Sequence, residues 1–159
     1  MGMVRTHLWF PERGHEAAQF YASVVPRSRI TSVVPAPAGV PDVPEGEPFV
    51  VEMELDGHAV TILTAGPAFR LDEAFSFYLS VETQEEVDHY WEALQADGGE
   101  PGQCGWLKDR FGVSWQVVPK ALDDIMTRPD AEGVARATKA MLTMTKLEIA
   151  PLEAAYAGE

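Results

Sequence analysis

The chain has 159 residues, which suits one compact domain or two small halves that share a core. Its 25 acidic residues against 12 basic ones give a formal net charge of −13, which disfavours binding to nucleic acid or to an anionic membrane surface. No stretch approaches the roughly 20 apolar residues of a membrane span, and the single cysteine, Cys104, fits a reducing cytoplasm. We therefore expect a cytoplasmic protein whose partners are small molecules and further copies of itself.

The first half of the chain alternates apolar runs with turn signals, in the order strand, helix, strand and hairpin. β-Branched and aromatic runs mark the strands, and apolar residues at helical spacing mark the helix. Asp56-Gly57 is a strong signal for a tight hairpin turn, because both residue types tolerate a positive φ. The predicted elements are a strand at 6–10, a helix at 15–25, and strands at 28–34, 49–55 and 58–64.

Two segments without a periodic pattern interrupt this series. Residues 35–48 hold most of the prolines of the first half and predict a long loop. Loops of that length are usually functional or mobile, so this one is a candidate lid. Residues 66–74 open with Gly66-Pro67 and are the candidate boundary between two halves.

The second half repeats the same order of elements. Thr83 and Glu86 have the spacing of a capping box at the start of a helix. Gly112 permits the positive φ that a hairpin loop at residues 109–112 requires. The predicted elements are a strand at 75–81, a helix at 83–97, and a hairpin of strands at 106–108 and 113–118.

Matching features in the two halves predict a duplication. The aromatic pairs Phe20-Tyr21 and Tyr90-Trp91 are 70 residues apart, whereas the hairpin glycines Gly57 and Gly112 are 55 apart. The difference of 15 is close to the length of the loop at 35–48, which the second half lacks. We expect an α+β fold of two tandem βαβββ modules at 1–66 and 75–119, followed by a helical extension at 120–159, all in one structural domain.

The extension carries three helical patterns. The first covers residues 121–127, the second runs from a cap at Asp130 to about residue 145, and the last begins at Pro151. These segments are apolar on one side, so they must bury that side against the domain or a neighbouring subunit.

Three parts of the chain carry a resemblance to a known family: the strand THLWF with the following HEAAQFYASVVPRSRI, the hairpin GWLKDRFGVSWQVVP, and the tail ATKAMLTMTKLEIAPLEAAYAG. They resemble the PhnB-like branch of the vicinal oxygen chelate superfamily, which includes glyoxalase I, extradiol dioxygenases and bleomycin-resistance proteins. Members of the branch often carry the label 3-demethylubiquinone 3-methyltransferase. The resemblance implies paired modules that form a curved, mostly antiparallel sheet around a cavity, usually in a homodimer.

In metal-dependent members of that superfamily, four ligands, typically His, Gln or Glu, come from the first, fourth, fifth and eighth strands. The resemblance places these positions at Thr6, Ile62, Ser76 and Gln116. Ile62 cannot bind a metal and hydroxyls are poor neutral ligands, whereas catalytic divalent ions want about three imidazole, carboxylate or thiolate ligands. We therefore expect no metal at this site and no other cofactor.

Strand register extends these positions to a predicted ligand cavity. With Thr6 in the cavity, alternation puts Leu8 and Phe10 beside it and turns His7 and Trp9 toward the helix-packed face. With Gln116 in the cavity, Ser114 joins it and Trp115 packs under a helix. The predicted cavity residues are Thr6, Leu8, Phe10, Ile62, Thr64, Ser76, Tyr78, Ser114 and Gln116.

Glu52 and Glu54 share a face of the third strand and have two interpretations. In an apolar cup a carboxylate has a raised pKa and can serve as an acid or base, so both join the predicted cavity; on a solvated surface they have no such role. Cys104 reads as a small buried hydrophobe rather than a nucleophile. Asp109 and Arg110 read as a local turn and ion pair rather than a substrate contact.

Three functions stay open. The first is metal-independent binding of a small, partly apolar molecule, with or without turnover. The second is a metal-dependent lyase, isomerase or dioxygenase with its ion at a shifted site. The third is the methyl transfer of the family label, which the sequence disfavours because its only double glycine, Gly98-Gly99, follows a helix instead of linking a strand to a helix.

Overall fold

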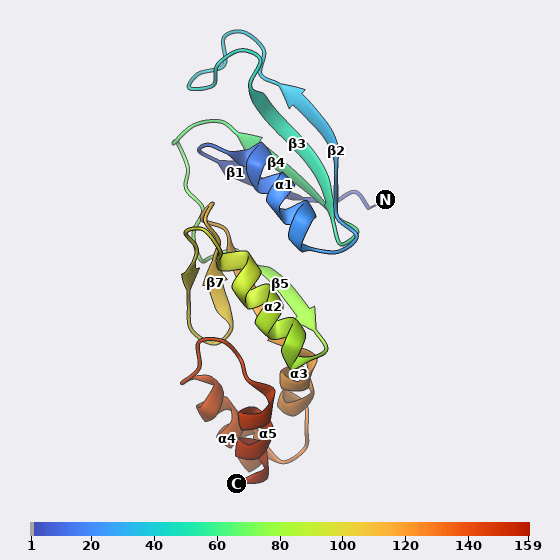
Figure 1. Cartoon of the computed structure of the whole chain (residues 1–159), viewed down its shortest axis with the longest axis vertical. Coiled ribbons are helices and arrows are strands. Elements are labelled where there is room, and N and C mark those ends of the chain that lie inside the picture. The colour runs from blue at the N-terminus through green and yellow to red at the C-terminus, as the bar shows by residue number, and fades with distance from the viewer. Residues whose placement is uncertain (1) are drawn as a thin grey trace. The chain divides into compact units, whose positions relative to one another are not determined.

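The series of strand, helix, strand and hairpin occurs twice along the chain, first in blue to green and then in green to orange in Figure 1. The computed structural model describes residues 2–159, and the chain divides into two units, Met1–Leu71 and Asp72–Glu159. The elements of the first unit are β1 (Thr6–Phe10), α1 (Gly14–Val24), β2 (Arg29–Pro35), β3 (Pro48–Leu55) and β4 (His58–Thr64).

The four strands of the first unit form a mixed sheet in the order β1-β4-β3-β2. β1 runs parallel to β4, with Leu8 paired to Ile62, and the other neighbours are antiparallel. The β3–β4 hairpin turns at Asp56 and Gly57, whose φ angles of 49° and 80° match the twist of the flanking strands. The hairpin predicted from this dipeptide is confirmed.

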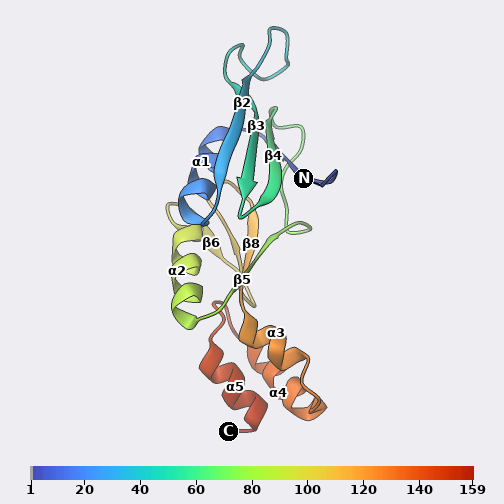
Figure 2. The ribbon, with the colours of Figure 1, turned by 90° about the vertical axis from the view of Figure 1, so that its right-hand side faces the viewer.

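Helix α1 covers one face of the first sheet (Figure 2), and Gly14 identifies that face. A Cβ at Gly14 would lie 2.7 Å from Ile62 Cγ2 and would clash with Thr64 Oγ1, to which the Gly14 N–H donates. Residues paired across neighbouring strands share a face, so Leu8 and Phe10, which pair with Ile62 and Thr64, also face α1. They are 4% and 0% exposed and belong to the core of this unit.

The second unit repeats the arrangement of the first. Its sheet has the order β5-β8-β7-β6, with β5 parallel to β8, so each strand has a counterpart in the first sheet. The predicted α+β fold of two tandem βαβββ modules is confirmed. The capping box is present too, because Thr83 and Glu86 bond each other's backbone N–H. The elements are β5 (Phe77–Val81), α2 (Gln84–Gln95), β6 (Glu100–Pro101), β7 (Trp106–Lys108) and β8 (Ser114–Pro119).

The C-terminal extension forms three helices, α3 (Lys120–Met126), α4 (Ala131–Met141) and α5 (Ile149–Ala157), grouped at the C-terminal end of the second unit (Figure 1). They share a small core with the end of β8, and Leu147 and Leu152 are fully buried in it. The N–H groups of Cys104 and Gly105 donate to the carbonyls of residues 144 and 145. The extension therefore packs within its own unit. None of the helices between residues 2 and 159 is long and apolar enough to span a membrane.

Candidate functional site

One face of the second sheet carries the polar side chains that are best placed to contact a ligand. Tyr78 pairs with Gln116, which pairs on its other side with Trp106, so these three share a face. Trp115 and Leu107 belong to the adjacent row and point to the opposite face, where they are buried. Helix α2 lies on one side of this sheet (Figure 2) and contacts β7 and β8. We assign the buried row to that side. We call the side with Tyr78, Trp106 and Gln116 the open face of the second sheet.

Gln116 and Ser76 form a hydrogen-bonded pair on this open face. Gln116 Nε2 donates to Ser76 Oγ at 3.0 Å, and both residues are half-buried. An amide and a hydroxyl together offer a ligand both donors and acceptors. The pair can therefore orient a polar group without carrying charge.

Tyr78 lies next to this pair and is tied to the C-terminal extension. Its hydroxyl donates to Asp123 Oδ1 of α3 at 3.0 Å. Desolvation of the phenolate, and then the hydrogen bond to Asp123, raise the pKa of Tyr78 to about 12. Tyr78 is therefore a neutral phenol at physiological pH, held in place by a residue of the extension.

Ser114 occupies the same face two residues before Gln116. Ser114 is 2% exposed, and its Oγ is buried without a hydrogen-bond partner among residues 2–159. It lines a cavity of about 120 Å³ together with Glu100, Trp106 and Lys108. Because a buried hydroxyl without a partner is costly, such groups are often kept for a functional reason.

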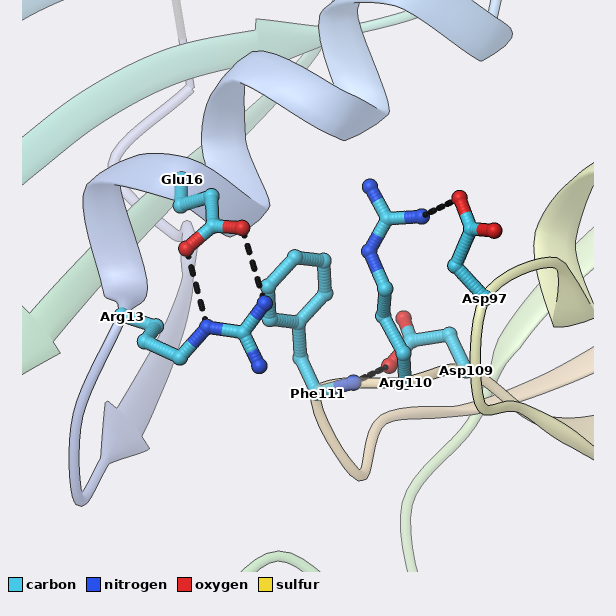
Figure 3. A network of polar contacts seen from close by, with 6 residues as sticks. All are labelled: Arg13, Glu16, Asp97, Asp109, Arg110 and Phe111. Atoms are coloured by element: carbon cyan, nitrogen blue, oxygen red, sulfur yellow. Dashed lines mark hydrogen bonds and ion pairs between the residues drawn. The ribbon is translucent and has the colours of Figure 1, made fainter.

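A buried aspartate, Asp109, organises the tip of the β7–β8 hairpin (Figure 3). Asp109 is 3% exposed and accepts hydrogen bonds from the N–H groups of Phe111 and Val113 and from Trp115 Nε1, at 2.9 to 3.0 Å. The predicted local turn is confirmed. Arg110 donates to Asp97 Oδ2 at 3.1 Å, so this ion pair joins the hairpin to the turn that follows α2.

The first unit has its own ion pair at the start of α1 (Figure 3). Arg13, with a positive φ of 62°, donates to both carboxylate oxygens of Glu16 at 2.8 and 2.9 Å. The two side chains are 45% and 51% exposed, and exposed ion pairs contribute little to stability.

The register of the first sheet corrects one prediction. His7 and Trp9 lie on the face that α1 leaves open, whereas Leu8 and Phe10 pack against α1. The predicted packing of His7 and Trp9 against the helix is therefore wrong. Gly14 explains the outcome, because the missing side chain lets the start of α1 approach β4 closely.

The residues predicted for the cavity thus divide by unit and by face. In the first sheet, Leu8, Phe10, Ile62 and Thr64 lie on the α1 side with Thr6, whose Oγ1 is 2.7 Å from His58 Nε2. In the second unit, Ser76, Tyr78, Ser114 and Gln116 do lie together. That a ligand contacts Ser76, Tyr78, Ser114 and Gln116 stays a prediction.

Glu52 and Glu54 lie on the open face of the first sheet, and both are ion-paired. Arg5 donates to Glu52 at 2.9 Å and to Thr61, its neighbour across the strands, at 3.2 Å. Arg29 donates to Glu54 at 2.9 Å and holds the pKa of that carboxyl below its ordinary value. The raised pKa predicted for a carboxylate in an apolar cup is wrong for Glu54.

The matching topology of the sheets shows which residues are equivalent. The pair Leu8–Ile62 of the first sheet corresponds to the pair Leu79–Val117 of the second. One residue earlier on each strand, His7 and Thr61 therefore correspond to Tyr78 and Gln116. Sequence reasoning assigned His7 to the wrong face and did not consider Thr61. The signal was available, because the 55 residues between the hairpin glycines also separate Thr61 from Gln116.

The metal-dependent chemistry of the superfamily requires a suitable donor set. The open face of the first sheet offers His7 and Thr61 at the equivalent positions, and that of the second sheet offers Tyr78 and Gln116. Neither pair includes a carboxylate. Across residues 2–159, no three His, Cys, Asp or Glu side chains are grouped as metal ligands. These residues do not fit a catalytic divalent ion.

Comparisons with known proteins agree with this fold. A family model described as 3-demethylubiquinone-9 3-methyltransferase matches residues 3–118. The chain is similar to the PhnB protein of Bacillus cereus, with 28% identity and a TM-score of 0.67 over 74% of this chain and 99% of that one. No curated protein matches the chain.

Two further solved structures are similar in fold alone. Protein PA1353 of Pseudomonas aeruginosa is 20% identical, with a TM-score of 0.62 over 75% of this chain and 98% of that one. The fosfomycin resistance protein FosX of Listeria monocytogenes is 14% identical, with a TM-score of 0.56 over 80% of this chain and 98% of that one. The family match ends at residue 118, so α3, α4 and α5 lie beyond it.

Proposed function

The chain belongs to the 3-demethylubiquinone-9 3-methyltransferase family, in the PhnB-like branch of the vicinal oxygen chelate superfamily, and on that premise we propose that it binds a small, partly apolar molecule without a metal ion. The site is the open face of the second sheet. Gln116 and Ser76 supply the directed hydrogen bonds, and Trp106 and Tyr78 supply flat aromatic surface. The observation that carries the proposal is the half-buried Gln116–Ser76 pair on a face that α2 does not cover.

This composition is typical of ligand recognition, where apolar and aromatic walls surround a few directed polar groups. A general acid or base works best with a pKa near the operating pH. Tyr78 and Lys108 share this face, and the pKa of each is raised, which moves it away from neutrality. The local chemistry therefore favours binding over proton transfer.

The family description names methyl transfer, and the topology offers little support for it. The common S-adenosylmethionine enzymes hold their cofactor where a Gly-rich turn links a strand of an open parallel sheet to a helix. Here each four-stranded sheet contains one parallel pair, β1–β4 or β5–β8. We expect calorimetry to detect no binding of S-adenosylmethionine, and micromolar binding would favour methyl transfer instead.

We further propose that the protein acts as a cytoplasmic homodimer. The family resemblance supports the dimer, and the single, half-buried Cys104 suits a reducing compartment. Sedimentation equilibrium at micromolar concentration tests the assembly. A mass of 17.4 kDa, that of one chain, would contradict it.

A binding experiment on metal-stripped protein tests the central proposal. Chelator-treated, ¹⁵N-labelled protein is titrated with neutral aromatic alcohols and ketones. We expect saturable shifts of the Gln116 side-chain amide and of the backbone amides of Ser76 and Tyr78. Gln116→Leu should abolish them, whereas Gln19→Leu, a matched change at an exposed position of α1, should not. Shifts that map elsewhere, or that appear only after Zn, Mn, Ni or Fe is added, would overturn the proposal.

A further inference from the structure

The small cavity beside Ser114 is not explained by neutral ligand binding at Gln116. Its walls come from β6, β7, β8 and the segment before β5, and all of them belong to the second unit. Strand pairing sets Glu100 opposite Lys108 and Lys108 opposite Ser114. The volume of about 120 Å³ admits a group of a few heavy atoms, since one water occupies about 30 Å³ in the liquid.

The charges around this cavity do not cancel. Lys108 Nζ bonds Glu73 Oε1 at 2.5 Å. That bond raises the pKa of Lys108 and lowers the pKa of Glu73, so both side chains stay charged near neutrality and offset each other. Glu100 also lines the cavity and is left as the excess negative charge. A cation is therefore favoured there over an anion.

Ser114 and Trp106 determine which kind of cation suits the cavity. The Ser114 hydroxyl is buried, lines the cavity and has no hydrogen-bond partner among the described residues. Rotation about its Cα–Cβ bond, between staggered rotamers, can turn Oγ toward a ligand. The Trp106 ring forms another wall, and an indole face attracts an ammonium group.

We propose that this cavity is a subsite for a primary ammonium group of the ligand, which donates hydrogen bonds to Ser114 Oγ and to the Glu100 carboxylate beside the Trp106 ring. A primary ammonium has three N–H donors and no acceptor, so it matches two acceptors and an aromatic face. The inference rests on the proposed binding function and specifies its ligand as an amine with an apolar portion.

Propylammonium chloride is the probe, compared with sodium propionate and with sodium chloride at equal ionic strength. In ¹H–¹⁵N spectra we expect propylammonium alone to give saturable shifts of the Ser114 and Lys108 amides and of the Trp106 indole N–H. Glu100→Gln and Ser114→Ala should each weaken binding by about tenfold or more, as expected for lost hydrogen bonds to a charged group. Glu73→Gln should weaken it too, because Lys108 then repels the probe. Glu85→Gln, an exposed change on α2, is the matched control and should have no effect.

Three results would overturn the subsite: equal or stronger shifts with propionate, unchanged affinity in Glu100→Gln, or no saturable shift with propylammonium. The last result would assign the cavity to structural water. Glu100 is exposed, so its variant keeps the test interpretable if Ser114→Ala folds poorly. If neutral aromatic ligands still shift Gln116 while propylammonium shifts nothing, the subsite fails and the proposed function stands. Binding of propylammonium without any neutral ligand at Gln116 would show the reverse.

Discussion

Replacement of Ser114 by alanine should stabilise the folded chain. The Ser114 hydroxyl is buried and has no hydrogen-bond partner within residues 2–159. Water bonds this hydroxyl in the unfolded chain, so folding loses those bonds without replacement, at a cost of about 1–3 kcal/mol. Removal of one oxygen leaves a void smaller than a methyl group, and this void lowers the free energy of unfolding by less than about 1 kcal/mol. We expect the free energy of unfolding to rise by about 1 kcal/mol, or Tm by about 2–4 °C for a chain of this size.

Urea unfolding followed by circular dichroism measures this change, with an unaltered m-value as the sign that only stability has shifted. Ser80→Ala is the matched control, because Ser80 is exposed on the same sheet and its replacement should change stability by less than about 0.5 kcal/mol. If Ser114→Ala lost about 1 kcal/mol while Ser80→Ala stayed neutral, the hydroxyl would have a bound partner and the reasoning would be refuted. A gain in stability with weaker propylammonium binding is the trade-off expected at a functional site.

Three further predictions test contacts within each of the two units. Gly14→Ala should lower the free energy of unfolding by about 1–3 kcal/mol through overpacking. In a double-mutant cycle, Thr64→Ala should relieve part of that cost. Additive effects of the two substitutions would contradict the assigned face of α1. Asp123→Asn should lower the pKa of Tyr78 from about 12 but not as far as 10.0, because desolvation, the larger cause of the shift, remains. An ultraviolet titration, with Tyr78→Phe as the reference, measures this pKa. An unchanged pKa would show that Asp123 has no influence on Tyr78. Leu147→Ala, at a fully buried position, should cost about 2–5 kcal/mol, and thermal unfolding that shows a neutral effect would indicate that the extension is not packed on its unit.

The local signals of the sequence were enough to predict the repeated fold. Asp56-Gly57 specifies a hairpin through positive φ, and Thr83 with Glu86 specifies the start of a helix through backbone bonds. Strand β6 was missed because Glu100-Pro101 is too short to show alternation. Helix α4 ends at Met141, before the predicted residue 145, because the chain turns there and bonds Cys104 and Gly105.

The candidate site was predicted only in part, for a physical reason. Alternation shows which residues share a face of a strand, but it does not show which face a helix will cover. The cavity residues predicted with Gln116 do lie together in the second unit. The residues predicted to share a cavity face with Thr6 pack against α1 instead. Strand periodicity could not predict this, because the close approach of α1 at Gly14 is a tertiary contact.

The central claim is that binding at Gln116 needs no metal ion. The most direct test measures the Kd of one neutral ligand that shifts Gln116, first on chelator-treated protein and then after addition of one equivalent of Zn, Mn, Ni or Fe. We predict the same Kd in each case and no binding to Gln116→Leu. A Kd that improves about tenfold or more with one of the ions, equivalent to about 1.4 kcal/mol, would contradict the claim.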